Sequence, residues 1–283
     1  MLCRNLVRRA LADGVLPKRL RHAVRGAVCG LLDLLFPDEC RVCETPLHEV
    51  SRIPVCSACL RPPTPLNAEF NCRTCRTPFL NRHPLDETGQ CALCRLGLNG
   101  FDEVYSAGAY EGTLRKLIHL FKFNGIQPLS RPLASFLVHT LPRDQRFDAI
   151  VPMPLHWRRR WQRGFNQSEL LAREIARRWH VPVKNPVRRK RATAPQAGLT
   201  SAQRRKNVQG AFEAKRDARL DGLSIVLVDD VLTTGATASA CARALKRAGA
   251  AHVSLITLAR RDRRAGIESQ TNSYAFAAGG SQA

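Results

Sequence analysis

Residues 225–250 read IVLVDDVLTTGATASACARALKRAGA. Four apolar residues run directly into Asp229 and Asp230, and a helix is predicted over residues 236–248, ended by Gly249. The apolar run predicts a buried parallel strand, and open α/β sheets bind ligands at the carboxyl ends of such strands. Because buried carboxylates are costly without a partner, we expect a ligand beside these two acids.

The loop after the two acids has the composition of a phosphate site. Residues 233–237, TTGAT, offer backbone N–H groups, three hydroxyls and a flexible glycine at a helix start, which is where anions bind. Vicinal carboxylates just before the loop can accept hydrogen bonds from sugar hydroxyls, so the predicted ligand is a ribose 5-phosphate unit. Neither G-x-x-x-x-G-K-[ST] nor G-x-G-x-x-G occurs at this turn. An ordinary strand–turn–helix with acids by chance is the alternative.

Strand-like and helix-like segments alternate around this stretch. A mainly parallel sheet with helices on both faces is typical of such alternation, so the predicted fold class is α/β. Ser168 is a candidate N-terminal cap for the helix predicted over residues 166–180. The pattern predicts a strand or hairpin over residues 103–110, strands over 147–154 and 252–260, and helices over 112–125 and 166–180.

Eight cysteines form four C-x-x-C pairs, separated by 12, 12 and 15 residues. Two thiolates three positions apart can approach one tetrahedral metal from a tight turn, and a second pair completes its coordination. The pattern therefore predicts two structural zinc sites, with sequential pairing the simplest and interleaved pairing open. Disulfides and a thioredoxin-like redox site are the alternatives. The predicted ligands are Cys40, Cys43, Cys56, Cys59, Cys72, Cys75, Cys91 and Cys94.

The charge balance constrains the partners and the location. The 283 residues carry 45 Lys+Arg against 23 Asp+Glu, a formal charge of +22, which favours nucleic acid, a phosphorylated small molecule or an anionic membrane over a merely solvated basic surface. No run of about 18 apolar residues occurs, and the Arg-rich N-terminus lacks the features of a secretory signal. An organelle presequence is the alternative there. We expect a cytoplasmic protein that is associated with membranes only through partners.

The organisation expected from composition has four segments. A helix is predicted over residues 23–36 within the first of them, and the last is small and polar. The segments are a basic extension (residues 1–38), a double zinc ribbon (39–96), an α/β domain (97–262) and a disordered tail (263–283).

The motifs taken together resemble a known family. IVLVDDVLTTGATA, residues 225–238, is similar to the phosphoribosyl diphosphate (PRPP) signature of type I phosphoribosyltransferases. With residues 117–125, 150–172, 193–212 and the cysteine pairs, it resembles the ComF family, including GntX-like proteins, over about residues 36–260. The resemblance implies a type I phosphoribosyltransferase-like fold behind a double zinc ribbon, binding of PRPP with Mg²⁺, and a role in DNA uptake, natural competence or use of external DNA.

The resemblance also implies roles for individual residues. Asp229 and Asp230 would hold the ribose hydroxyls, directly or through a metal, and the 5-phosphate would be held by Thr233, Thr234, Gly235, Ala236 and Thr237. The diphosphate would face Val151, Pro152, Met153 and Pro154, and Arg158 and Arg163 would neutralise it; an exposed basic helix start is the other interpretation of these arginines. Lys122 also matches the family. A mobile lid is implied over residues 193–207, with matching positions at Thr193, Gln196, Arg204 and Asn207.

Two functions of different classes are left open. The first is a phosphoribosyltransferase that displaces diphosphate from the anomeric carbon, with no acceptor or catalytic residue identified. The second is a non-catalytic competence factor that binds single-stranded DNA and keeps the PRPP site as a sensor or relic. Residues 156–206 favour it because they contain 15 Lys/Arg, two acids and four interleaved aromatic residues, Trp157, Trp161, Phe165 and Trp179. DNA-uptake machinery at the inner membrane face is a further implied partner.

Overall fold

The computed structural model describes residues 39–47, 51–66, 68–96, 98, 100–142, 145–191 and 201–261. The chain divides into two compact units, Met1–Arg61 and Pro62–Ala283. The boundary falls between the second and third cysteine pairs, so each unit holds one group of four cysteines. The helix predicted over residues 23–36 and the tail predicted from residue 263 lie outside the described residues.

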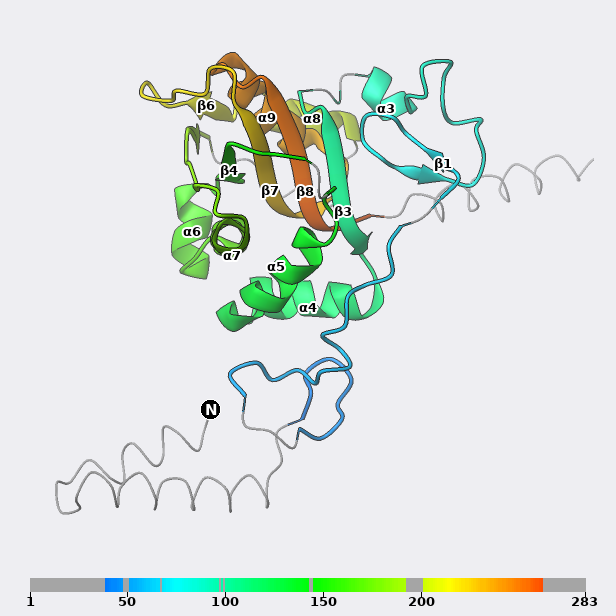
Figure 1. Ribbon diagram of the computed structural model, residues 1–283, viewed down its shortest axis with the longest axis vertical. Coiled ribbons are helices and arrows are strands. Elements are labelled where there is room, and N and C mark those ends of the chain that lie inside the picture. Colours follow the sequence, from blue (N-terminus) through cyan, green and yellow to red (C-terminus); the bar gives the residue numbers. More distant parts are fainter. Residues whose placement is uncertain are drawn as a thin grey trace, which may run out of the picture. The chain divides into compact units, whose positions relative to one another are not determined.

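A four-stranded parallel sheet forms the centre of the second unit (Figure 1). The central strands carry apolar residues on both sides rather than alternating apolar and polar ones, because both faces of the sheet are covered. Residues 225–228, for example, are fully buried. Ile225 pairs with Val253 on one side and with Ala149 on the other. The strand order is β3–β8–β7–β4, with bounds β3 Glu103–Ala109, β8 His252–Arg260, β7 Ser224–Leu232 and β4 Ala149–Pro152. The segment predicted as a strand or hairpin over residues 103–110 is therefore a single strand.

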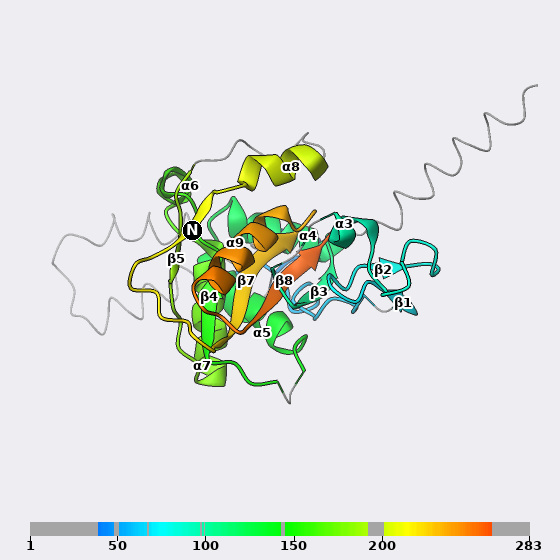
Figure 2. The same cartoon turned by 90° about the horizontal axis from the view of Figure 1, so that it is seen from above.

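Helices cover both faces of this sheet, which confirms the predicted fold class. Figure 2 shows α5 (Ser130–Val138) and α7 (Gln167–Trp179) on one side and α8 (Ser201–Val208) and α9 (Ala236–Arg247) on the other. α4 (Gly112–Lys122) follows β3 and buries its apolar stripe. The remaining elements of the described chain are α3 Ala92–Arg95, η1 Gln127–Leu129, α6 Trp157–Arg163 and two antiparallel pairs, β1 Phe70–Asn71 with β2 Pro78–Phe79 and β5 Val187–Arg189 with β6 Phe212–Ala214.

The start of α7 corrects one prediction. Ser168, the expected cap, lies inside the helix, and the cap is Asn166, whose Oδ1 accepts the Ser168 N–H at 3.1 Å. A side-chain oxygen at the residue before a helix reaches the N–H two positions further on, which has no intrahelical acceptor. The Ser168 hydroxyl is thereby left for another contact.

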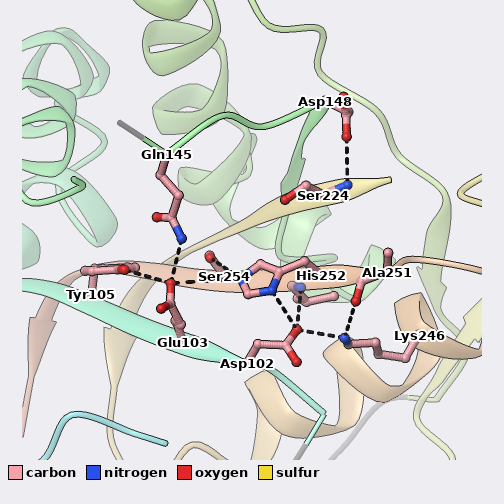
Figure 3. Close-up of polar contacts among 11 residues, drawn as sticks. Asp102, Glu103, Tyr105, Gln145, Asp148, Ser224, Lys246, Ala251, His252 and Ser254 are labelled. Carbon is pink, nitrogen blue, oxygen red and sulfur yellow. Dashed lines mark hydrogen bonds and ion pairs between the residues drawn. The ribbon is translucent and has the colours of Figure 1, made fainter. Parts of the chain in front are cut away.

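The amino ends of the strands are joined by a separate polar network (Figure 3). Asp102 accepts the Val253 N–H at 2.7 Å and forms an ion pair with Lys246 Nζ at 2.7 Å. Asp148 accepts the Ser224 N–H at 2.8 Å. These interactions join β7, β8 and α9 at the amino ends of the strands. The amino ends and the carboxyl ends of the sheet are therefore formed by different polar residues.

Candidate functional site

The described residues enclose a pocket of about 280 Å³ beside the carboxyl ends of β3, β4 and β7. Parallel strands bring their carboxyl ends to one edge, so the walls come from segments far apart in sequence. We call it the carboxyl-end pocket. It is lined by Tyr110, Lys122, Met153, Pro154, Leu155, Arg163, Asn166, Gln167, Ser168, Arg189, Asp229, Asp230, Val231, Leu232, Thr233, Gly235, Thr237 and Ala238.

Two neighbouring carboxylates, Asp229 and Asp230, lie in this pocket. Asp230 is 9% exposed, and its Oδ2 lies 2.7 Å from Lys122 Nζ at the end of α4. Asp229 Oδ1 accepts the Ser168 hydroxyl at 3.3 Å and the Asp230 N–H at 2.9 Å. Burial, and then the charge of Asp230, raises the pKa of Asp229 to about 7, against opposing effects of Lys122 and the two hydrogen bonds. Asp229 therefore changes its charge near neutral pH.

The loop between β7 and α9 has the geometry of an anion site. Gly235 precedes α9 with a φ of 79°, a left-handed conformation that glycine adopts at little cost. α9 has 12 residues, and the N–H groups of a first helical turn bind anions. Thr233, Gly235 and Thr237 line the pocket. Thr234 and Ala236 are not among its lining residues; Thr234 Oγ1 instead accepts the Ala236 N–H at 3.5 Å.

Three consecutive buried polar residues join the walls of the pocket; we call residues 166–168 the polar clamp. Asn166 Nδ2 donates to Met153 O at 3.1 Å, which holds the segment after β4. Gln167 Nε2 donates to Lys122 O at 3.4 Å, which holds the end of α4. Ser168 reaches the acid pair as described above. The three side chains belong to residues that are 9%, 2% and 4% exposed, and buried polar groups must be hydrogen-bonded, so the clamp also determines the geometry of these walls.

The segment predicted to face a diphosphate is divided by the structure. Val151 and Pro152 are buried in β4, whereas Met153 and Pro154 line the pocket. Arg163 also lines it, donates to the Gln167 side chain at 3.2 Å and lies 5.4 Å from the centre of the Phe123 ring.

The other predicted residues lie elsewhere. Arg158 is exposed outside the pocket lining, with its guanidinium 5.3 Å from the Trp157 ring centre. Of the predicted lid, Thr193 and Gln196 fall outside the described residues. Arg204 and Asn207 lie on α8, and the Asn207 carbonyl accepts a bond from Arg191 at 3.3 Å.

Sequence reasoning missed several lining residues. Ser168 was interpreted only as a cap, although its hydroxyl contacts Asp229, which lies 61 residues further along the chain. Arg189 was counted among the basic residues of 156–206, yet it lines the pocket with its guanidinium 5.4 Å from the Phe212 ring centre. Tyr110 follows β3 directly, and its position at a carboxyl strand end is a signal that could have identified it.

The eight paired cysteines form two groups, in the sequential arrangement. Within each group the sulfur atoms lie within 4.8 Å of one another, and neighbouring sulfur atoms are separated by 3.6 to 3.7 Å. Ligands at about 2.3 Å from a tetrahedral ion lie about 3.8 Å apart, so both groups fit a metal such as zinc. None of these eight cysteines forms a disulfide bond. The first cluster is Cys40, Cys43, Cys56 and Cys59, and the second is Cys72, Cys75, Cys91 and Cys94.

The four aromatic residues proposed for base stacking have different environments. Trp157 and Trp161 on α6 are 65% and 85% exposed. Trp179 stacks on Phe147 with ring centres 6.0 Å apart, and Phe165 packs against Phe121, so both are partly buried. Only the two α6 tryptophans are therefore exposed among these four.

Comparison with known proteins agrees with this geometry. A parallel sheet with an acid pair and an anion loop after one strand defines a phosphoribosyltransferase-type domain, and residues 166–275 match the family model of the phosphoribosyl transferase domain.

The chain is 32% identical to DNA utilization protein YhgH of Escherichia coli K12 over 80% of this chain and 99% of that protein. It is 33% identical to competence protein F of Haemophilus influenzae, covering 60% and 78%, and 30% identical to competence protein ComFC of Bacillus subtilis, covering 81% and 88%. The chain belongs to the ComF family.

Among the described residues, no helix is long and apolar enough to cross a bilayer.

Proposed function

We propose that the carboxyl-end pocket binds PRPP. The observation that supports this most strongly is the meeting, in one pocket, of the acid pair Asp229 and Asp230 with the anion loop at the start of α9. The acids accept hydrogen bonds from the 2′ and 3′ hydroxyls of the ribose, and the loop holds the 5-phosphate through backbone N–H groups.

Basic side chains on the other walls suit the diphosphate end of PRPP. Lys122, Arg163 and Arg189 all line the pocket, and arginine binds phosphate oxygens in a bidentate manner. Two adjacent carboxylates are also ligands that suit Mg²⁺, which would neutralise the diphosphate when bound. The pocket therefore contains anionic groups for the sugar and cationic groups for the leaving group.

A transfer reaction in this pocket breaks the bond between the anomeric carbon and diphosphate, and an acceptor forms the new bond to that carbon. The role of the protein residues is to hold the sugar and stabilise the negative charge that develops on diphosphate. We propose a role in DNA uptake or the use of external DNA, because the relatives are named as DNA utilization and competence proteins. Zinc is the metal proposed for both cysteine clusters.

Calorimetric titration of PRPP with Mg²⁺ tests the proposal. The wild type should bind saturably, and Asp229→Asn/Asp230→Asn should not, while an Asp148→Asn variant at the opposite edge of the sheet should bind like the wild type. Absence of binding to a folded, metal-loaded wild type would refute a working PRPP site.

A second function, binding of single-stranded DNA, is favoured by one observation on α6. Trp157 and Trp161 are the two exposed tryptophans described above; Arg158 lies over the Trp157 ring, and Arg160 is on the same helix. Bases stack on exposed aromatic rings, each worth about 1–3 kcal/mol, while cations bind the phosphate backbone.

Intrinsic fluorescence offers a direct test, because the chain has three tryptophans. Addition of oligothymidine should quench most of the emission, and Trp157→Ala/Trp161→Ala should lose both the quenching and most of the affinity. Trp179→Phe, which changes the partly buried ring, should leave affinity unchanged. Equal affinity of the double variant and the wild type would exclude α6 as the stacking surface.

A further inference from the structure

The chain that leaves the second cysteine cluster runs onto the anion loop. Cys91 directly precedes the short helix α3 and Cys94 lies within it, and after the helix the Leu98 N–H donates to Leu93 O at 3.1 Å. Leu98 is 4% exposed. A Cβ placed on Gly235 would lie 2.9 Å from Leu98 Cδ2 and 3.1 Å from Cδ1. The Leu98 side chain therefore lies directly against the Gly235 Cα, in the loop proposed to hold the 5-phosphate.

A second contact lies two residues further along. A Cβ placed on Gly100 would lie 2.9 Å from the Arg243 N and 3.0 Å from the Ser239 O, so the chain here packs on the backbone of α9. Gly100 has a φ of 106°, which favours glycine. Leu98 and Gly100 therefore contact both the loop and the middle of the helix that follows it.

The other half of the second cluster is joined to β8. The Arg260 guanidinium donates to Cys75 O at 2.8 Å and to the Thr77 hydroxyl, and Thr77 Oγ1 lies 2.9 Å from Cys75 Sγ. Arg260 is 4% exposed and Thr77 is 1% exposed. A buried charge needs its full set of partners, so the cysteine turn and the carboxyl end of β8 constrain each other. The cluster is thus anchored to the sheet on one side and to α9 on the other.

The four cysteines of the second cluster are part of the same apolar core as Leu98, Ala236 and Ala238. A tetrahedral metal bound there would connect the turn at Cys72 and Cys75 to α3, and hence determine where Leu98 lies. The first cluster belongs to the other compact unit. The chain therefore provides its own matched control, a cluster of the same ligand type that belongs to a different compact unit from Leu98 and Gly235.

We propose that metal at the second cluster, acting through Leu98 as a positioning residue, holds the anion loop in its binding conformation, whereas metal at the first cluster does not. This inference rests on the proposed function, since it assigns a determinant of phosphoribosyl binding. Without the metal, the Leu98 side chain is no longer held against Gly235, and the loop loses the preorganisation that anion binding requires.

Leu98→Ala is the central variant, because it leaves every cysteine in place. We expect its zinc content and circular dichroism to match the wild type, while affinity for PRPP falls about tenfold or more because the loop must be ordered on binding. Leu98→Met, which restores side-chain volume, should recover most of the affinity. Unchanged affinity in Leu98→Ala would overturn the proposal.

The cluster variants form the second part of the experiment. Cys91→Ser/Cys94→Ser should lose about one zinc per chain and lose PRPP binding, and Cys40→Ser/Cys43→Ser should lose about one zinc and keep it. Equal loss of binding in both pairs, or retention in both, would contradict the proposal.

Hydrogen exchange separates this inference from the PRPP proposal. If the wild type does not bind PRPP, the proposed function fails, but the amides of residues 233–239 still report on the loop. Their exchange should be faster in Leu98→Ala than in the wild type, and Leu98→Met should restore protection. Unchanged exchange would show that Leu98 does not position the loop, whatever the ligand.

Discussion

Replacement of Lys122 by methionine tests the electrostatics of the carboxyl-end pocket. Lys122 Nζ lies 2.7 Å from Asp230 Oδ2, and the two side chains are only 22% and 12% exposed. At an effective dielectric constant of about 20, two unit charges at this distance attract by about 6 kcal/mol, before desolvation is subtracted. Methionine keeps the apolar stem but leaves Asp230 without its cation. Breaking a largely buried pair costs about 3–5 kcal/mol, and the residual exposure favours the lower value, about 3 kcal/mol.

The loss of stability should depend on pH. Lys122 lowers the pKa of Asp229, so its removal raises that pKa further above about 7. A carboxyl whose pKa is higher in the folded than in the unfolded protein contributes stability at low pH, and that contribution is lost as pH rises through the folded-state pKa. The free energy of unfolding should therefore fall by about 3 kcal/mol at about pH 8 and by clearly less at about pH 5.5, where the acid pair takes up a proton.

Urea denaturation at both pH values measures this difference. Lys116→Met, an exposed lysine on the same helix, is the matched control. Asp230→Asn and the double variant complete a thermodynamic cycle, in which we expect a coupling energy of about 2–3 kcal/mol. A loss in Lys122→Met that equals the control, or that is the same at both pH values, would refute the reasoning.

Three further predictions concern the same pocket. Gly235→Ala should lower the free energy of unfolding by about 2 kcal/mol, because alanine disfavours a φ of 79° and its Cβ would lie 2.9 Å from Leu98 Cδ2. A loss below about 0.5 kcal/mol in urea denaturation would contradict this prediction. Asp229→Asn should melt at a higher temperature than the wild type above about pH 7, because the amide stays neutral whereas Asp229, with a pKa of about 7, becomes charged while buried. This difference should shrink as the pH falls and vanish near about pH 4, the pKa of an aspartate in the unfolded chain. A lower melting temperature of Asp229→Asn at about pH 8 would argue against the pKa shift. Asn166→Ala should lower the free energy of unfolding by about 2 kcal/mol, since it removes a helix cap and the hydrogen bond to Met153 O. Asn166→Asp should recover about half of this loss, because an aspartate keeps the cap alone. Equal stability of the two variants in thermal melts would show that the cap contributes nothing.

Much of the fold could be predicted from local pattern. The apolar run at residues 225–228 indicates a strand buried on both faces, and the turn at Gly235 indicates a helix start, since both follow from periodicity and backbone preference. The alternation of strands and helices then restricts the topology to a parallel sheet. Spacing made sequential grouping of the cysteine pairs the simplest prediction but left interleaved pairing open, and the structure has the sequential grouping.

The rest of the site depends on contacts between distant segments. Ser168 resembles a helix cap in sequence, and only the packing of α7 against β7 brings its hydroxyl to Asp229. Arg189 belongs by sequence to a basic stretch, yet its position in β5 turns it into the pocket. Four interleaved aromatic residues have the same appearance in sequence, and burial separates Trp161 from Trp179. Exposure is a property of the packed chain, so pattern could not assign it.

The sequence by itself determined the class of fold and the eight cysteines that form the two clusters, because each depends on residues close together in the chain. Only the tertiary structure decided which cation pairs with Asp230, which polar residues join the pocket walls and that the second cluster reaches Gly235 through Leu98. Leu98 and Gly235, for example, are 137 positions apart in the chain. Contacts over such separations are specified by the packing of the whole core rather than by local preference.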